Sequence, residues 1–463
     1  MSTFIQRTRA LGDAKVPTHI IDALGDRIAQ GAELGSVLKH QNTTLTPRIL
    51  LGIWRAARIH QRHMAHLDEV AEKRRKAGLP AIAPAVLKQT VSAHEVAVLG
   101  RAEALAPPGS VAEHRRRDAI KEALALWKAC LAIAHKEGEL EIKLITDDPA
   151  LTGEFGDLAE KTSLGELKGH RWMAVRRGVD AGALDLTLEV PVKRLVDQMK
   201  ARGTELAALA RGEKDEELLQ KLVLVDLDEW AMALKDEAAR SAAYRSAANA
   251  YLNLLAEPRP SQPLAAGVYL ADGQVGVAVV GREGEWHGGG TAPLGAQPMA
   301  TVEKLIGNHP VELVVLPTRS KDPEVLNAVL GGFGEHFQVL RVLPNALKAA
   351  VAIEGPAPTG GEAAAFAAVL ARRALNPLKA WGQLDPIALG LAEYQKDLDE
   401  VELRAWMVDM KVLAETGVKP DDLARPAAKP KLPRGPAKPL NPLIKSVDDL
   451  RPGLVVNGVV TNI

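Results

Sequence analysis

The stretch that decides the fold reads Ala265-Ala-Gly-Val-Tyr-Leu-Ala-Asp-Gly-Gln-Val-Gly-Val-Ala-Val-Val-Gly281. Two apolar runs flank a turn that contains Asp-Gly, and this pattern predicts a β-hairpin. Toward the C-terminus a third short strand is expected at Trp286, and helices and strands then alternate. They are a helix near Met299 to Ile306, a strand from Val311 to Leu316, a helix from Pro323 to Gly334, a strand from Phe337 to Leu343 and a helix from Gly361 to Leu375. A hairpin followed by such units predicts a mixed sheet flanked by helices.

The half of the chain before this hairpin has a different pattern. From Ile20 to about Leu255 the apolar residues recur at spacings of three and four, which predicts helices. Turn residues at Ala106-Pro-Pro-Gly109 interrupt this run. Two segments, Glu139 to Ile145 and Ala183 to Val190, alternate charged and apolar residues instead. Each is therefore expected to form a short, half-exposed strand.

Composition limits the class of protein. A chain of 463 residues is long enough for two to four domains, and its 58 basic and 58 acidic residues leave no net charge. Any nucleic-acid binding must therefore come from local patches. The single cysteine, Cys130, lies in an apolar helical run and is expected to be buried, and no disulfide within the chain is possible. No signal peptide or membrane span is evident, so a cytoplasmic location is expected.

The C-terminal segment differs from the rest. Residues 424–445 are rich in Pro, Ala and Lys and contain no acidic residue, which predicts an extended basic linker. The last ten residues, Leu454 to Ile463, have the pattern of a single strand.

Four stretches of this sequence resemble, in the same order, motifs of the Tex family of bacterial nucleic-acid-binding transcription accessory proteins. They are His170-Arg171 with Arg177-Gly178, preceded by Phe155-Gly-Asp157; Ala371-Arg-Arg373 with Asn376-Pro-Leu378; Leu384-Asp-Pro386 with Gly390 and Tyr394-Gln-Lys-Asp397; and Asp449-Leu-Arg-Pro-Gly453 with Gly458-Val-Val-Thr-Asn462. The resemblance extends over residues 138–399 and 446–463.

The resemblance implies a multidomain fold, mainly α in the N-terminal half, with an α/β RNase H-like domain in the C-terminal half and the first strand of an OB-fold at the end. The expected parts are a helical N-terminal region (1–100), a helical core with short strands (101–257), a YqgF/RNase H-like domain (258–399), a helix with the basic Pro-rich linker (400–445) and the start of a truncated OB-fold RNA-binding domain (446–463). The family's helix-hairpin-helix repeats are expected after Asp399, where the chain has one helix, Glu400 to Thr416, and then the linker.

The RNase H-like domain is predicted to be inactive. Nucleases of this fold hold two metal ions with three or four carboxylates, because in-line attack on a phosphodiester needs both oxygens stabilised. At the three matched positions this chain has Tyr269, Asn345 and Asn376, while Asp272 lies in the hairpin turn and Asp322 at the far end of a loop. We therefore predict no catalytic residue, no bound metal and no cofactor. A working RuvC-like nuclease that depends on Asp272 remains the enzymatic alternative.

Two further patterns are weak indications of chemistry. His60, His63 and His66 recur every third residue beside arginines, which is typical of a solvated helix face rather than a metal site. Gly288-Gly-Gly290 lacks a following Lys-Ser or Lys-Thr, so it is expected to be a loop between strand and helix rather than a phosphate-binding loop.

Basic clusters are the candidate contacts for nucleic acid, although such clusters also commonly do no more than solvate a helix. The predicted binding residues are Arg115, Arg116, Arg117, Arg176, Arg177, Lys429, Lys431, Arg434 and Lys438, with Lys73 to Lys76 as a further cluster. Aromatic residues make up only 3% of the chain, so stacking surfaces should be scarce. The sequence thus favours a non-enzymatic transcription accessory protein that binds RNA or DNA weakly, without sequence preference, and contacts the transcription machinery but no membrane. The alternative is a protein-interaction scaffold or decaying paralogue that no longer binds nucleic acid.

Overall fold

The structure is a computed structural model that describes residues 16–41, 45–76, 93–105, 107, 109–209, 213–294, 297–320, 323–333, 337–392 and 394–423. The chain divides into two compact units, Met1–Asp422 and Leu423–Ile463, and almost all described residues belong to the first. The predicted basic linker and the predicted OB-fold strand, with Lys429, Lys431, Arg434 and Lys438, lie outside the described residues, as does Asp322.

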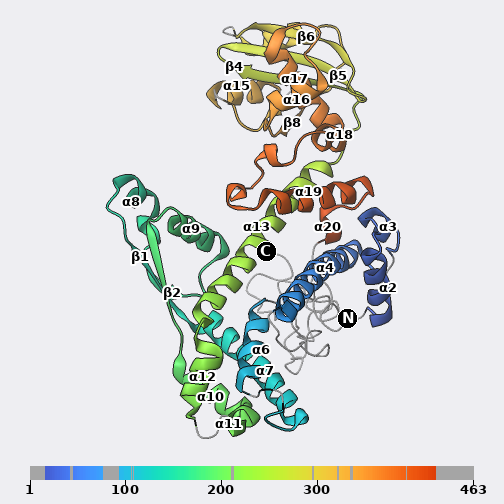
Figure 1. The fold of residues 1–463 in the computed structure, drawn as a ribbon. Coiled ribbons are helices and arrows are strands. Elements are labelled where there is room, and N and C mark those ends of the chain that lie inside the picture. The colour runs from blue at the N-terminus through green and yellow to red at the C-terminus, as the bar shows by residue number, and fades with distance from the viewer. Residues whose placement is uncertain are drawn as a thin grey trace, which may run out of the picture. The chain divides into compact units, whose positions relative to one another are not determined.

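The N-terminal half is helical, as the spacing of its apolar residues predicts (Figure 1). Its helices are α2 (Thr18–Ala29), α3 (Leu34–Leu38), α4 (Pro47–Lys76), α6 (Ala93–Leu105), α7 (Glu113–Glu137), α8 (Pro149–Phe155), η1 (Gly156–Leu158), α9 (Gly169–Asp180), α10 (Val192–Arg202), α11 (Thr204–Leu209), α12 (Asp215–Leu219), the π-helix η2 (Gln220–Leu224) and α13 (Leu227–Leu255). The predicted turn near Gly109, whose φ is 81°, separates α6 from α7. Cys130 of α7 is fully buried, as predicted.

A small antiparallel sheet interrupts these helices. Its strands β1 (Glu139–Leu144), β2 (Lys161–Ser163) and β3 (Leu184–Glu189) lie in the order β2-β1-β3. β1 and β3 confirm the two strands predicted from alternation, because Leu140 and Leu188 face the interior while the charged residues between apolar ones face solvent. The three residues of β2 are too few to show a period, and this strand was not predicted.

The long helix α13 contacts several other elements of the fold. Near its middle, Asp236 accepts a hydrogen bond from the Trp172 indole of α9 (3.3 Å). Two turns later the ring of Tyr244 stacks on Trp406 of α19 (Glu400–Glu415), with centroids 6.0 Å apart. The Tyr244 hydroxyl also accepts from the backbone N–H of Asp399, just before α19 (3.0 Å). Helix α13 therefore positions both α9 and α19.

The C-terminal part contains the predicted mixed sheet. Its strands are β4 (Leu264–Ala271), β5 (Gln274–Gly281), β6 (Trp286–Pro293), β7 (Leu313–Pro317) and β8 (Gln338–Val342), in the order β6-β5-β4-β7-β8. β4, β5 and β6 are antiparallel neighbours, whereas β4, β7 and β8 run parallel. The turn between β4 and β5 has positive φ at Asp272 (53°) and Gly273 (72°), as a tight hairpin turn requires. The hairpin prediction is confirmed.

Helices cover both faces of this sheet (Figure 1). α14 (Pro298–Ile306) and α15 (Pro323–Phe333) contact one face, and α17 (Gly361–Leu375) contacts the other. α16 (Leu347–Glu354) and α18 (Pro377–Gly382) pack against α17, and η3 (Ile387–Leu389), η4 (Gln395–Asp397), α19 and α20 (Pro420–Leu423) follow. Val268 and Leu270 pack in one core cluster with residues of α14 and α15. Gly267 and Tyr269 alternate with them and meet α17, where the Tyr269 ring lies edge-on to Phe366 (5.1 Å).

One prediction for this region was wrong, and one helix was missed. Gly288 to Gly290 were expected in a loop, but they lie within β6 and pair with β5. At Gly289 the neighbouring backbone is too close for a side chain, because a Cβ there would lie 2.2 Å from the Val277 carbonyl oxygen. Helix α16 was not predicted at all.

Among the described helices, none combines the length and the hydropathy that crossing a bilayer requires.

Candidate nucleic-acid interface

The three predicted arginines of α7 do not form an open basic patch. The Arg115 Nε lies 3.0 Å from a carboxylate oxygen of Glu205. The Arg116 side chain is only 13% exposed, and its guanidinium lies 3.3 Å from carboxylates of both Glu103 and Glu113. Arg117 is exposed and has no ion pair among the described residues. One arginine of this cluster is therefore available to phosphate, and Arg116 serves mainly to join α6 to α7.

The two predicted arginines of α9 have different surroundings. Arg176 is half-buried, and its Nε is buried without a hydrogen-bond partner among the described residues. The Arg177 side chain is 43% exposed, and its guanidinium donates to a carboxylate oxygen of Asp397 in η4 (3.1 Å). A second carboxylate, that of Glu154 in α8, lies 4.0 Å away. Arg177 therefore fastens α9 to η4.

A second contact joins the same two elements. His170, in the first turn of α9, is exposed, and its ring stacks on that of Tyr394, which immediately precedes η4. The ring centroids are 6.5 Å apart and the planes are inclined by 27°. Both segments carry motifs that resemble those of the family, but the sequence analysis did not predict that they meet. We name this contact of α9 with residues 394–397 the α9–η4 surface.

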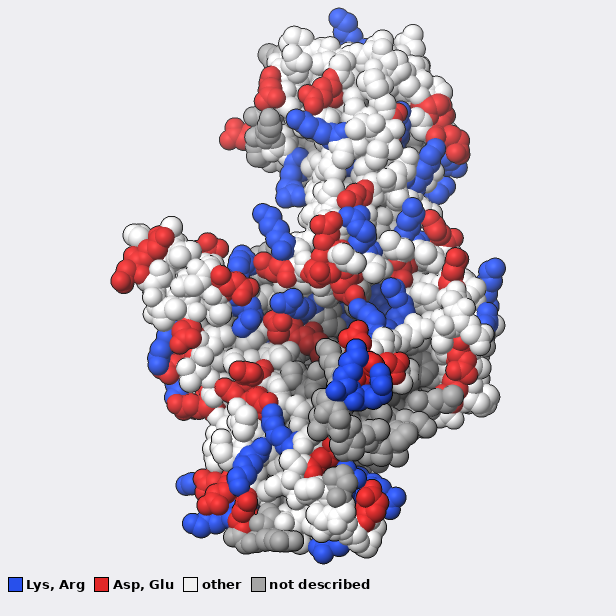
Figure 2. All heavy atoms as spheres, in the orientation of Figure 1, with Lys and Arg blue, Asp and Glu red and all other residues white. Residues whose placement is uncertain are grey.

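Charges of both signs lie around the α9–η4 surface. Lys168 and Lys396, each two residues from one of the stacked rings, are exposed and have no ion pair among the described residues. Arg171 is paired instead, with Nε 3.2 Å from Glu160. Figure 2 shows the same mixture over the whole face in view, where basic and acidic side chains are interspersed. A strong sequence-independent attraction for polyanions is not expected from such a surface.

Two of the three positions matched to nuclease carboxylates lie at the same edge of the five-stranded sheet. Tyr269 is near the end of β4, and Asn345 follows β8. The Asn345 side chain accepts from Arg319 (3.1 Å) and donates to the Leu389 carbonyl oxygen (2.6 Å), so its amide has a structural role. Ser320, which follows β7, donates to the Leu270 carbonyl oxygen at the same edge (3.4 Å).

The third position, Asn376, does not lie beside the other two. Tyr269 contacts Phe366, whereas Asn376 comes ten residues later, just beyond the end of α17, or roughly 15 Å along the helix axis. The Asn376 side chain instead accepts from the backbone N–H of Lys379 (3.4 Å) and caps α18. Among the described residues no group of three or more His, Cys, Asp or Glu side chains could hold a metal ion. His60 lies in α4, but the side chains of His63 and His66 lie outside the description.

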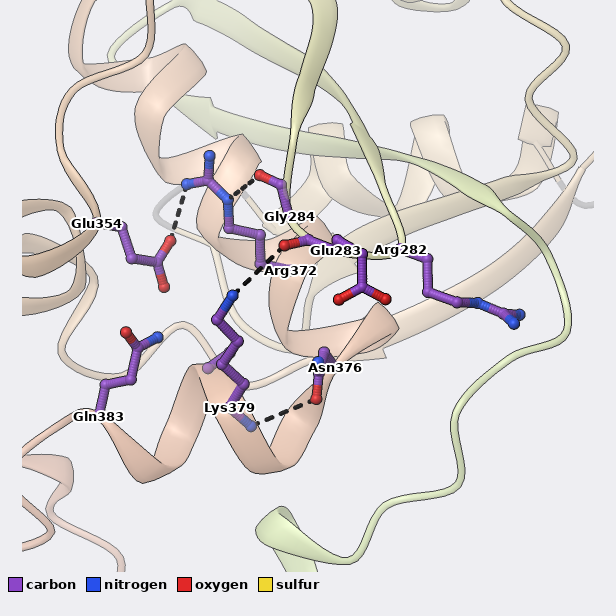
Figure 3. Close-up of a pocket in the computed structure, with 9 residues that line it drawn as sticks. Arg282, Glu283, Gly284, Glu354, Arg372, Asn376, Lys379 and Gln383 are labelled. Carbon is purple, nitrogen blue, oxygen red and sulfur yellow. Dashed lines mark hydrogen bonds and ion pairs between the residues drawn. The ribbon is translucent and has the colours of Figure 1, made fainter.

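A pocket of about 210 Å³ lies beside this end of α17 (Figure 3). It is lined by Arg282, Glu283, Gly284, Glu354, Arg372, Asn376, Lys379, Ala380 and Gln383. The Arg372 guanidinium donates to Glu354 (2.8 Å) and to the Gly284 carbonyl oxygen (2.9 Å), and Lys379 donates to the Glu283 carbonyl oxygen (3.5 Å). In Figure 3 the Arg282 guanidinium points away from these groups. Since Arg372 and Lys379 are already engaged, the pocket is a weaker candidate than the α9–η4 surface.

Arg373, the neighbour of Arg372, is fully buried. Its Nη1 donates to the Leu343 carbonyl oxygen (2.7 Å), and its guanidinium stacks on the Trp381 ring at 3.8 Å. Burial lowers the pKa of Arg373 to about 9, so the group stays charged at neutral pH. This arginine belongs to a segment that resembles a family motif, yet it ties α17 to the end of β8 rather than facing a ligand.

Comparisons with known proteins do not assign this chain to a family. No family model matches the chain, and no curated protein has a significantly similar sequence.

Proposed function

We propose that this protein is a non-enzymatic, nucleic-acid-binding transcription accessory protein of the Tex type, with an inactive RNase H-like domain, that acts in the cytoplasm. The observation that carries the proposal is the contact between two motif segments. Arg177 and Asp397 are 220 positions apart in the sequence and form a direct hydrogen bond. His170 and Tyr394 add a ring contact beside it. This contact supports the proposal because it brings two of the four motif segments to one surface.

The proposed domain organisation fits the described elements. The mixed sheet with helices on both faces is compatible with an RNase H-like domain, and the helical half with its small sheet is compatible with the family's helical core. At positions that the resemblance matches to nuclease carboxylates this chain has Tyr269 and Asn345, whose uncharged side chains would not offset the repulsion between two divalent cations. The proposal is therefore a domain that binds but does not cleave.

The direct test is fluorescence anisotropy of the full chain with labelled single-stranded RNA, single-stranded DNA and duplex DNA. We expect weak binding of a single strand that falls by roughly 10-fold between about 50 and 200 mM salt, because the few phosphate contacts release counterions. Incubation of the same strands with magnesium or manganese should leave them intact. Absence of binding at low salt would remove the proposal, and cleavage that Asp272→Asn abolishes would restore the nuclease alternative.

One observation favours the second candidate, a protein-interaction scaffold. Four of the five predicted arginines that the structure describes are either paired with carboxylates, as Arg115, Arg116 and Arg177 are, or half-buried, as Arg176 is. A pull-down with the full chain, repeated after nuclease treatment, separates the two functions. A partner that persists after nuclease treatment supports the scaffold, whereas a partner that disappears was held through nucleic acid.

A further inference from the structure

We propose that His170, backed by Tyr394, is a stacking platform for an unpaired nucleobase, which makes single-stranded nucleic acid the ligand of the α9–η4 surface. This inference rests on the proposed function and names the ligand class for it. Aromatic rings and imidazoles bind unpaired bases through their flat faces, and they do so with little regard to sequence because every base has such a face.

The geometry makes His170 the outer ring of the pair. His170 is exposed while Tyr394 is half-buried, and the two planes are inclined by only 27° at a centroid distance of 6.5 Å. Tyr394 is therefore the inner ring of the pair, and His170 presents its outer side to solvent.

Two exposed lysines flank the rings in the sequence, and their charge suits a strand that carries phosphates. Lys168 precedes His170 by two residues and Lys396 follows Tyr394 by two, and both ammonium groups are exposed without an ion pair among the described residues. The nearby carboxylate of Asp397 is bonded to Arg177, so its repulsion of a phosphate is reduced.

The ligand class follows from these features. In a duplex the faces of the bases are covered by their neighbours, so a ring can stack only on a base that has left the helix. The surface also offers two exposed lysines, unpaired within the described part of the chain, rather than a long basic track. Base stacking should therefore supply a substantial share of the affinity, and a single strand should bind more tightly than a duplex of the same length.

The experiment compares the full chain with variants in the same anisotropy assay, using a labelled single strand and an abasic strand with the same backbone. We expect the wild type to bind the abasic strand about 10-fold more weakly than the strand with bases. His170→Ala should lose about 10-fold in affinity for the strand with bases and little for the abasic strand. His114→Ala, at an exposed histidine of α7, is the matched control and should bind like the wild type.

The two proposals fail in different ways. If the wild type binds the two strands equally, or if His170→Ala binds the strand with bases as tightly as the wild type, the stacking inference is overturned while nucleic-acid binding stands. If the wild type binds no strand at low salt, the proposed function is overturned and the inference falls with it. Tyr394→Ala should reproduce the loss seen for His170→Ala, whereas Tyr394→Phe should keep the affinity because it keeps the ring.

Discussion

Gly267 is the point of closest approach between β4 and α17, and Gly267→Ala tests the sheet most sharply. A Cβ at this position would lie 1.8 Å from the carbonyl oxygen of Ala367, whereas ordinary contact begins at 3.4 Å. The obstructing atom belongs to the helix backbone, so no side-chain rotation can relieve the overlap. Helix α17 must move away by roughly 1.6 Å, or strand β4 must deform.

The size of the loss follows from what α17 buries. Phe366, Val369 and Leu370 of α17 are buried. A gap of about 0.5–1 Å already removes a quarter to a half of the dispersion energy of each contact that it opens. Added to the strain of overpacking, this predicts that Gly267→Ala lowers the free energy of unfolding of this part by about 3 kcal/mol or more.

The measurement is hydrogen exchange of the β4 and β5 amides, followed by mass spectrometry in increasing urea, because it reports on this sheet separately from the helical half. Gly276→Ala, whose Cβ would lie 2.2 Å from the Ala363 carbonyl carbon, should behave similarly. Gly153→Ala in α8 meets no atom within 4 Å and should be neutral or stabilising by up to about 1 kcal/mol. If Gly267→Ala exchanges like the wild type, α17 does not lie against β4 as described.

Three further outcomes are expected. Burial raises the pKa of Tyr251 to about 12, above its value in the unfolded chain. The stability that this tyrosine contributes is therefore present below about pH 10 and is lost as the pH rises toward 12. Tyr251→Phe should show a smaller fall in the urea midpoint at alkaline pH than the wild type. Burial also raises the pKa of the Cys130 thiol to about 12, so iodoacetamide should label this cysteine only as the protein unfolds, and rapid labelling of the native protein would contradict its burial. Exchanging the charges of Arg177 and Asp397 should restore the stability that either single charge reversal loses. A double-mutant cycle should give a coupling free energy of about 1 kcal/mol or less. Additive effects of the two reversals would show that the side chains do not interact.

The elements that the sequence predicted are those whose pattern is local. The alternation in Glu139 to Ile145 and the Asp-Gly turn after Ala271 are complete within a few residues, and the structure places β1 and the β4–β5 hairpin there. Gly288 to Gly290 were misassigned because the reason for glycine lies outside the segment. A Cβ on Gly288 would meet the His309 ring at 2.6 Å, and one on Gly289 would meet β5.

The candidate interface was only partly predictable for the same reason. Charge is visible in a sequence, but the group that neutralises it is not: Glu205 is 90 positions from Arg115, and Asp397 is 220 positions from Arg177. The stacked ring of Tyr394 was equally invisible. An aromatic content of 3% suggested that stacking surfaces were scarce, although a single exposed pair is enough to form one.

Helix α13 limits how the length of this chain can change. It meets α9 at Asp236 and Ala239, and it meets α19 at Tyr244, only five residues later. One residue inserted between Ala239 and Tyr244 would turn the two docking faces about 100° out of register. Among any descendants of this gene, insertions and deletions should therefore be excluded from that short interval, whereas the exposed turn at Asp272 and Gly273 could lengthen freely.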